Sequence, residues 1–163
     1  MIPGIFTALY GVVDSMTTAN GFNFDWRATK GDSRYFAESF RPSLNVKLET
    51  GAGNEYEESN AQGNDQYGID ERVIITGRIP VVDMDVDAED VPYEAQLAQS
   101  KGFQDILHAY AVPGDYIGPV LTAGAVDMWY DSHEYIINEG AQRYNTMQVQ
   151  VTFFVKYFMD RRV

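Results

Sequence analysis

The sequence of 163 residues contains no cysteine, only two histidines, and half as many basic as acidic residues. Without cysteine the chain has no disulfide, thiolate zinc site, iron–sulfur cluster or cysteine nucleophile. The apolar start, residues 1–13, is shorter than the roughly 20 residues that span a bilayer and lacks the basic residues that begin a signal peptide. We therefore expect a soluble protein of the compartment in which it is made.

The scarcity of bases sets the overall charge, because 12 Lys and Arg against 24 Asp and Glu give a formal net charge of −12. Thirteen of the acids fall in two runs without a base, at 49–71 and 83–94. Since nucleic-acid backbones are bound through Lys and Arg, this charge disfavours tight nucleic-acid binding. The length and the 45% hydrophobic content are those of one folded unit, so we expect a single domain over 1–163.

The first part of the chain shows one helical and one alternating pattern. In residues 3–18, apolar side chains recur three and four apart, which predicts an amphipathic helix. Residues 21–39 are rich in aromatic side chains but keep no period, so we expect a loop there. The alternation over 44–48 predicts a strand with one buried face.

Residues 50–70 are rich in Gly, Asn and acidic side chains and have no Val, Leu or Ile before Ile69. Such a composition buries too little apolar area to offset the entropy of ordering, so we expect the mobile tip of a long β-hairpin. The second strand of that hairpin follows over 71–85, where Pro80 argues against a central position at that point.

The second half of the chain predicts one more helix and two strands. Residues 91–110 return to helical spacing; Gly102 inside them costs about 1 kcal/mol relative to Ala unless close packing requires it. Strands follow over 125–137 and 147–160, the last with one wholly apolar face. Together these elements predict an α+β fold, with an antiparallel four-stranded sheet and two helices packed on one face in the order α-β-β-α-β-β.

The acidic run before the second helix has the spacing of a calcium loop. Counted from Asp83, the residues Asp85, Asp87 and Glu94 stand at positions 3, 5 and 12. Position 6 is Ala88 instead of the Gly that the sharp turn needs, and a strand precedes the run. Acids before a helix also satisfy its free N–H groups and favour its dipole. We favour this second interpretation and keep a calcium site as the alternative.

Other possible sites have weaker support. His108 and His133 show no metal-binding spacing, and no GxSxG motif favours a hydrolase. Aromatic side chains stack on bases or sugars in many proteins, but base stacking normally accompanies a basic groove. We therefore expect core or interface packing for the four most prominent aromatics, Trp26, Trp129, Tyr130 and Phe154.

The order of the elements resembles that of the tail terminator proteins of tailed bacteriophages. The resemblance covers most of the chain: an amphipathic first helix, a long hairpin with an acidic tip, a helix entered through AEDVPYEAQ, and a closing hairpin ending in MQVQVTFFVKYFMDRRV. It implies a virion protein, made in the host cytoplasm, that forms a ring of six subunits. This ring would cap the tail tube and join it to the head connector. The resemblance implies no enzyme activity, no catalytic residue and no cofactor.

Two groups of residues are expected to make contacts in such a ring. Large side chains on the second face of the last strand need cover other than water, which predicts a subunit interface at Phe154 and Phe158. Trp129 of the preceding strand, an aromatic expected to pack in the core or at an interface, is assigned to the same interface. Negative charge facing the channel would keep passing DNA from binding to its wall. We therefore expect three acids of the hairpin tip to face the lumen or the adjoining ring: Glu55, Glu57 and Glu58.

Three classes of function remain open from the sequence. The first is a structural ring protein, either a tail terminator or another neck or minor tail protein, because such proteins share related folds. The second is a calcium-dependent binding module built on the Asp83–Glu94 segment. The third is a small hydrolase or sugar-binding domain that uses the aromatic side chains, which would need a deep pocket with converging polar groups.

Overall fold

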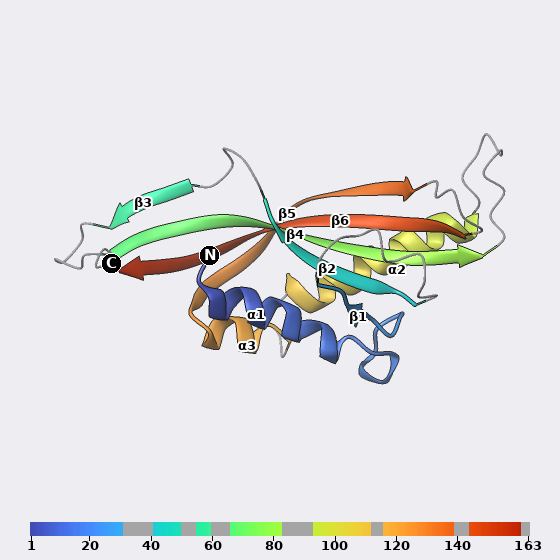
Figure 1. Ribbon diagram of the computed structural model, residues 1–163, viewed down its shortest axis with the longest axis horizontal. Helices are drawn as coiled ribbons and strands as arrows, with labels where there is room; N and C mark the ends of the chain where they lie inside the picture. Colours follow the sequence, from blue (N-terminus) through green and yellow to red (C-terminus); the bar gives the residue numbers. More distant parts are fainter. Residues whose placement is uncertain are drawn as a thin grey trace.

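The computed structural model describes residues 1–30, 41–49, 55–59, 66–82, 93–111, 116–138 and 144–160 (Figure 1). The helices are α1 (Pro3–Gly11), α2 (Tyr93–Tyr110) and α3 (Gly118–Thr122), with 3₁₀ turns η1 (Val12–Ser15) and η2 (Thr18–Asn20). The strands are β1 (Arg27–Ala28), β2 (Ser43–Leu48), β3 (Glu55–Ser59), β4 (Gln66–Val82), β5 (Ala125–Asn138) and β6 (Tyr144–Asp160).

Three long strands form the frame of the molecule. β4 and β6 pair antiparallel along their whole length, from Gln66 opposite Asp160 to Val82 opposite Tyr144. β5 pairs antiparallel with β6, while β3 and β2 pair with successive parts of β4. The two-residue β1 runs parallel to β2. The result is a six-stranded sheet with the path β1-β2-β4-β6-β5 and with β3 beside β4 (Figure 1).

This topology shows that the predicted antiparallel four-stranded sheet with two helices is wrong. The fold is α+β, but the sheet is mixed, and a third helix, α3, precedes β5. β1 and α3, with two and five residues, are too short to display a period in the sequence. β3 and the start of β4 lie inside the polar stretch 50–70, whose composition carries no strand signal.

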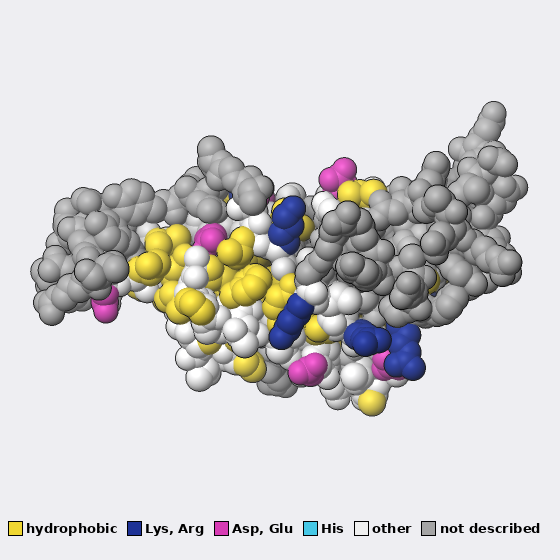
Figure 2. Space-filling model, viewed as in Figure 1, with side chains coloured by type: hydrophobic (Ala, Val, Ile, Leu, Met, Phe, Trp, Pro, Cys, Tyr) yellow, Lys and Arg dark blue, Asp and Glu magenta, His cyan; other side chains and the backbone are white. Residues whose placement is uncertain are grey.

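The N-terminal helix is shorter than the pattern over 3–18 predicts. α1 ends at Gly11, and η1 continues the chain as a tighter turn. At Met16 the carbonyl oxygen accepts a hydrogen bond from the Trp26 N–H at 2.9 Å, so the returning chain takes the place of a further helical turn. Figure 2 shows hydrophobic side chains gathered over α1 and the strands beside it.

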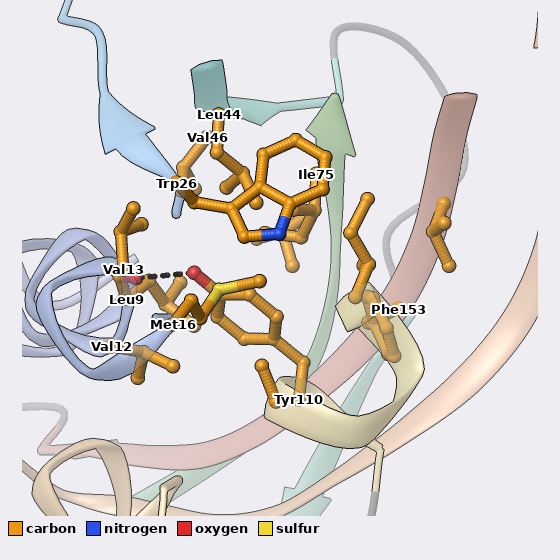
Figure 3. Close-up of a cluster of buried hydrophobic side chains, with 14 of the residues drawn as sticks. Leu9, Val12, Val13, Met16, Trp26, Leu44, Val46, Ile75, Tyr110 and Phe153 are labelled. Atoms are coloured by element: carbon orange, nitrogen blue, oxygen red, sulfur yellow. Dashed lines mark hydrogen bonds between the residues drawn. The ribbon is translucent and has the colours of Figure 1, made fainter. Parts of the chain in front are cut away.

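The helices cover one face of the sheet, and the core lies between these two layers (Figure 3). Along β6 every second side chain from Met147 to Tyr157 is buried, as the alternation predicts. The helices α1 and α2 meet above this layer, where the Tyr110 hydroxyl donates a hydrogen bond to the Leu9 carbonyl oxygen at 2.8 Å, the dashed line in Figure 3. This hydrogen bond joins the two helices above the core.

Two glycines allow α2 and the Trp26 indole to lie close to the sheet. A Cβ atom on Gly102 would lie 2.8 Å from Cδ1 of Ile79 and 3.3 Å from Cγ1 of Val149. On β4, a Cβ atom on Gly77 would lie 3.0 Å from the indole of Trp26. A methyl group at either position would require the neighbouring side chains to shift, so the close packing that favours a glycine inside a helix is present at Gly102.

A buried carboxylate holds residues 22–26 against α2. Asp105 is 2% exposed and accepts hydrogen bonds from the backbone N–H groups of Asn23 at 2.9 Å and Phe24 at 3.1 Å. The indole N–H of Trp26 donates to the same carboxylate at 2.8 Å. Residues 22–26, which show no helical or strand periodicity in the sequence, are thus held in place by polar contacts. β1 begins directly after them.

Candidate subunit interface

The face of the sheet opposite the helices, called here the open face, carries the three residues predicted for a subunit interface. Trp129 on β5 stacks on Phe154 of β6, with 5.3 Å between the ring centroids and 20° between the ring planes. Trp129 is exposed and Phe154 is half-buried. Phe158, 39% exposed, lies four residues further along β6. The structure therefore brings two of the three residues together and leaves Phe158 at a distance along the same face.

A side chain of the same chain shields part of the Phe154 ring from solvent. The guanidinium carbon of Arg72 lies 4.8 Å from the centre of the Phe154 ring. Arg72 also forms ion pairs with Glu49 at 3.6 Å and with Asp131 at 3.7 Å. A cation over an aromatic ring contributes about 0.5–1 kcal/mol at an exposed site. Of the two stacked rings, Trp129 is the more exposed and is therefore the one that a partner can contact.

β5 forms an edge of the described sheet, because it stands last in the strand path. Its residues are exposed from Val126 to Tyr135 with the exception of Met128. Several of these exposed side chains are large and apolar: Val126 (54% exposed), Trp129, Tyr130 and Tyr135 (44% exposed). An exposed edge strand presents backbone N–H and C=O groups to other chains, and clustered exposed aromatics are typical of contact surfaces.

Four rings from β5 and α2 pack together beside this edge. His133 stacks on Phe103 of α2 at 4.0 Å between centroids, and Tyr135 contacts both rings edge-on. The Tyr130 hydroxyl lies 2.6 Å from Nδ1 of His133. Burial raises the pKa of the Tyr135 phenol above its ordinary value, with a further contribution from Tyr130. The cluster holds the exposed tyrosines of the edge in fixed orientations.

Sequence reasoning missed this cluster because of a β-bulge. Strict alternation puts residues 130 and 133 on opposite faces of a strand. The register with β6 shifts between Tyr130 and Ser132, so that Tyr130 faces Phe153 while His133 faces Val151. The inserted residue places both side chains on the same face. The pattern of aromatics in 129–135 was visible, but the position of the bulge was not.

A groove of about 490 Å³ lies on the helix-covered face of the sheet, between α1 and β2. Its walls are formed by Phe6, Thr7, Tyr10, Lys30, Asn45, Val46, Lys47 and Leu48. The Tyr10 hydroxyl donates a hydrogen bond to the Val46 carbonyl oxygen at 2.8 Å, which fixes the helix against the strand. β1 pairs only with Ser43 and Leu44, so the groove runs along the part of β2 beyond that pairing.

The two outer strands of the sheet path carry opposite charge. β5 contains the exposed acids Asp127, Asp131 and Glu134 and no Lys or Arg. Around β1 and β2, four exposed bases form a group that we call the basic edge: Arg27, Lys30, Arg41 and Lys47. Figure 2 shows dark blue side chains over β1 and the segments around it.

One exposed acid, Asp25, lies next to the basic edge in the sequence. Its carboxylate accepts hydrogen bonds from the backbone N–H and the hydroxyl of Thr18, at 2.7 and 3.0 Å. These bonds stabilise the charged form and lower the pKa of Asp25. The carboxylate is thus engaged by Thr18 rather than by the bases beside it.

The remaining predicted residues are only partly described. Glu94 lies exposed in the first turn of α2, while Asp83, Asp85 and Asp87 fall outside the described residues. The acids of the expected tip lie on β3 next to β4, and their side chains are likewise outside the description: Glu55, Glu57 and Glu58. Within the described ranges, no group of three or more His, Asp or Glu side chains is arranged to hold a metal ion.

A search for membrane-spanning segments finds no helix in the described part of the chain that is long and apolar enough to cross a bilayer. A scan against models of known protein families finds no match to this sequence. A search of curated proteins finds no significant match either. The function must therefore be argued from the surfaces described above.

Proposed function

We propose that this chain is a structural virion protein, a tail terminator whose six subunits form a ring between the tail tube and the head connector. The observation that supports this best is the exposed edge strand β5, with Trp129, Tyr130 and Tyr135 on its surface. A strand of 14 residues that is exposed over most of its length favours contact with another chain. A ring gives every copy the same neighbour on each side and leaves no such edge free.

The charge of the chain supports a channel through which DNA passes without binding. Each subunit brings a formal charge of −12, and a ring concentrates this charge around its axis. Phosphate groups are repelled by such a wall and find few bases to hold them. In this proposal β3, with Glu55, Glu57 and Glu58, faces the lumen or the adjoining ring, and the partners are the tail tube protein and the proteins of the head connector.

The proposal is tested by the mass and shape of the purified protein. Native mass spectrometry and light scattering should give a particle with six copies of the 18.4 kDa chain. Negative-stain electron microscopy should show closed rings with a central hole. A chain that stays monomeric at the highest concentration it tolerates, and that shows only single compact particles, would overturn the ring.

A further inference from the structure

We infer that neighbouring copies in the ring meet through two different surfaces. The β5 edge of one copy docks into the groove between α1 and β2 of the next copy, beside its basic edge. This inference rests on the proposed function, because it names the contact that would build the ring. The occupant of the groove is a second copy of this chain.

Charge complementarity is the first argument for this pairing. The β5 edge offers the exposed acids Asp127 and Glu134, besides Asp131, which pairs with Arg72 of the same chain, and it contains no Lys or Arg. The groove is flanked by Lys30 and Lys47, which belong to the basic edge. Complementary potentials of this kind direct association and fix the register of the two partners. In a chain with twice as many acids as bases, four exposed bases around β1 and β2 form a marked local exception.

The apolar surfaces match as well. The groove has the apolar side chains Phe6, Val46 and Leu48 in its walls, together with the ring of Tyr10. The β5 edge presents exposed rings, and Tyr135 is the most exposed of them at 44%. Interfaces obtain most of their binding energy from a few aromatic anchors that fill pockets on the partner. Tyr135 lies on the face of β5 that meets α2, and Glu134 lies on the other face, so the edge offers an aromatic anchor and a negative charge on its two sides.

The shape of β5 favours docking through side chains. Its ladder with β6 has irregularities between Ala125 and Asp127 and between Tyr130 and Ser132. Bulges of this kind twist an edge and interrupt regular addition of a further strand. A groove that receives protruding rings does not require an uninterrupted backbone ladder, so it suits this edge better than a long strand-to-strand pairing.

The position of the two surfaces favours a head-to-tail arrangement. They lie at opposite ends of the strand path, with β5 and β1 on opposite sides of the right-hand half of the sheet in Figure 1. Contacts between two different surfaces propagate from copy to copy and close into a ring when the rotation fits. A symmetric contact between two β5 edges would instead place acids opposite acids, which is unfavourable.

The test uses two charge-reversed proteins and their mixture. One variant carries Asp127→Lys and Glu134→Lys on β5, and the other carries Lys30→Glu and Lys47→Glu at the groove. Each alone should require at least a tenfold higher concentration to form the ring, because equal charges then face each other. The mixture should form rings at the wild-type concentration, since each variant offers the surface that the other needs. Native mass spectrometry should find equal numbers of both chains in these rings.

Control variants separate the contact from general effects of charge and size. Asp14→Lys and Lys101→Glu change exposed residues outside both surfaces and should leave assembly unchanged. Tyr135→Ala should weaken assembly at least tenfold, whereas Tyr93→Ala, at a tyrosine that is 71% exposed on α2, should not. Circular dichroism and melting temperature confirm that each variant is folded.

The failure of this inference is distinguishable from the failure of the proposed function. A wild-type chain that forms no ring overturns the proposed function. A wild-type ring that tolerates both charge-reversed variants without a change in assembly overturns the docking contact and leaves the ring standing. An effect of the β5 variant alone, with normal assembly of the groove variant, indicates that β5 meets a different surface and also overturns the contact.

Discussion

At the scale of single residues, Asp105 connects the core to the basic edge. A buried carboxylate is costly unless donors surround it. Here the donors are two backbone N–H groups, the Trp26 indole and the Asn23 side-chain amide, which lies 2.8 Å away. Arg27, the first residue of β1, follows Trp26 directly. By holding Trp26, Asp105 therefore also fixes the position of Arg27, the first base of the basic edge.

Replacing Asp105 by Ala should lower the free energy of unfolding by about 2–4 kcal/mol, because buried donors lose a charged acceptor. Urea denaturation monitored by Trp fluorescence measures this loss. The matched control is Asp25→Ala, at an exposed carboxylate that is bonded only to Thr18 in the described structure. The control should cost much less. Equal losses in the two variants would contradict the assigned role of Asp105.

At the scale of elements, the closeness of α2 to the sheet depends on Gly102. The helix lies near enough for Ile79 and Val149 to occupy the space of a missing methyl group. The same approach places Phe103 over His133 on β5. The separation of helix and sheet thus also determines how the exposed tyrosines of the β5 edge are held.

We expect Gly102→Ala to destabilise the protein by up to about 2 kcal/mol. Overpacking of a core costs roughly 1–3 kcal/mol and exceeds the gain of about 1 kcal/mol in helix propensity. In the control Gly11→Ala, a Cβ atom would meet nothing within 4 Å, so the change should be neutral or stabilising. Thermal unfolding of both variants measures the difference. A more stable Gly102→Ala protein would show that α2 can move away from the sheet at little cost.

The elements that the sequence predicts well are the long periodic ones. The alternation on β6 and the helical spacing over 93–110 recur often enough to be unambiguous. β1 and β3 are strands because β2 and β4 offer them backbone partners, and their own side chains carry no such information. For the candidate interface, Trp129 and Phe154 could be predicted from the face they share, while the groove between α1 and β2 could not.

At the scale of the whole molecule, two buried hydroxyl groups join distant parts of the chain. Tyr110 bonds to Leu9 on α1, and the Tyr157 hydroxyl donates to the Glu71 carboxylate at 2.6 Å. The Met1 ammonium lies 2.9 Å from that carboxylate. Burial raises the pKa of both phenols, and the negative Glu71 raises that of Tyr157 further.

Global stability should therefore fall in alkaline solution. A raised folded-state pKa leaves stability intact below the unfolded value of about 10 and loses it as the pH rises above that value, by about 1.4 kcal/mol per pH unit for each tyrosine. Urea unfolding across this range should show a shallower decline for Tyr110→Phe than for the wild type. The exposed control Tyr93→Phe should follow the wild type. Identical slopes for Tyr110→Phe and wild type would contradict the linkage.

The sequence alone determined the acidic charge, the apolar faces of β4 and β6, and two of the three helices, because periodicity and composition act within a single segment. Tertiary structure decided the mixed strand order, the bulge that gathers the rings on β5, and the placement of acids and bases at opposite edges. These features depend on which segments meet across long stretches of chain. That information resides in the packing of all the strands together and in no single pattern along the sequence.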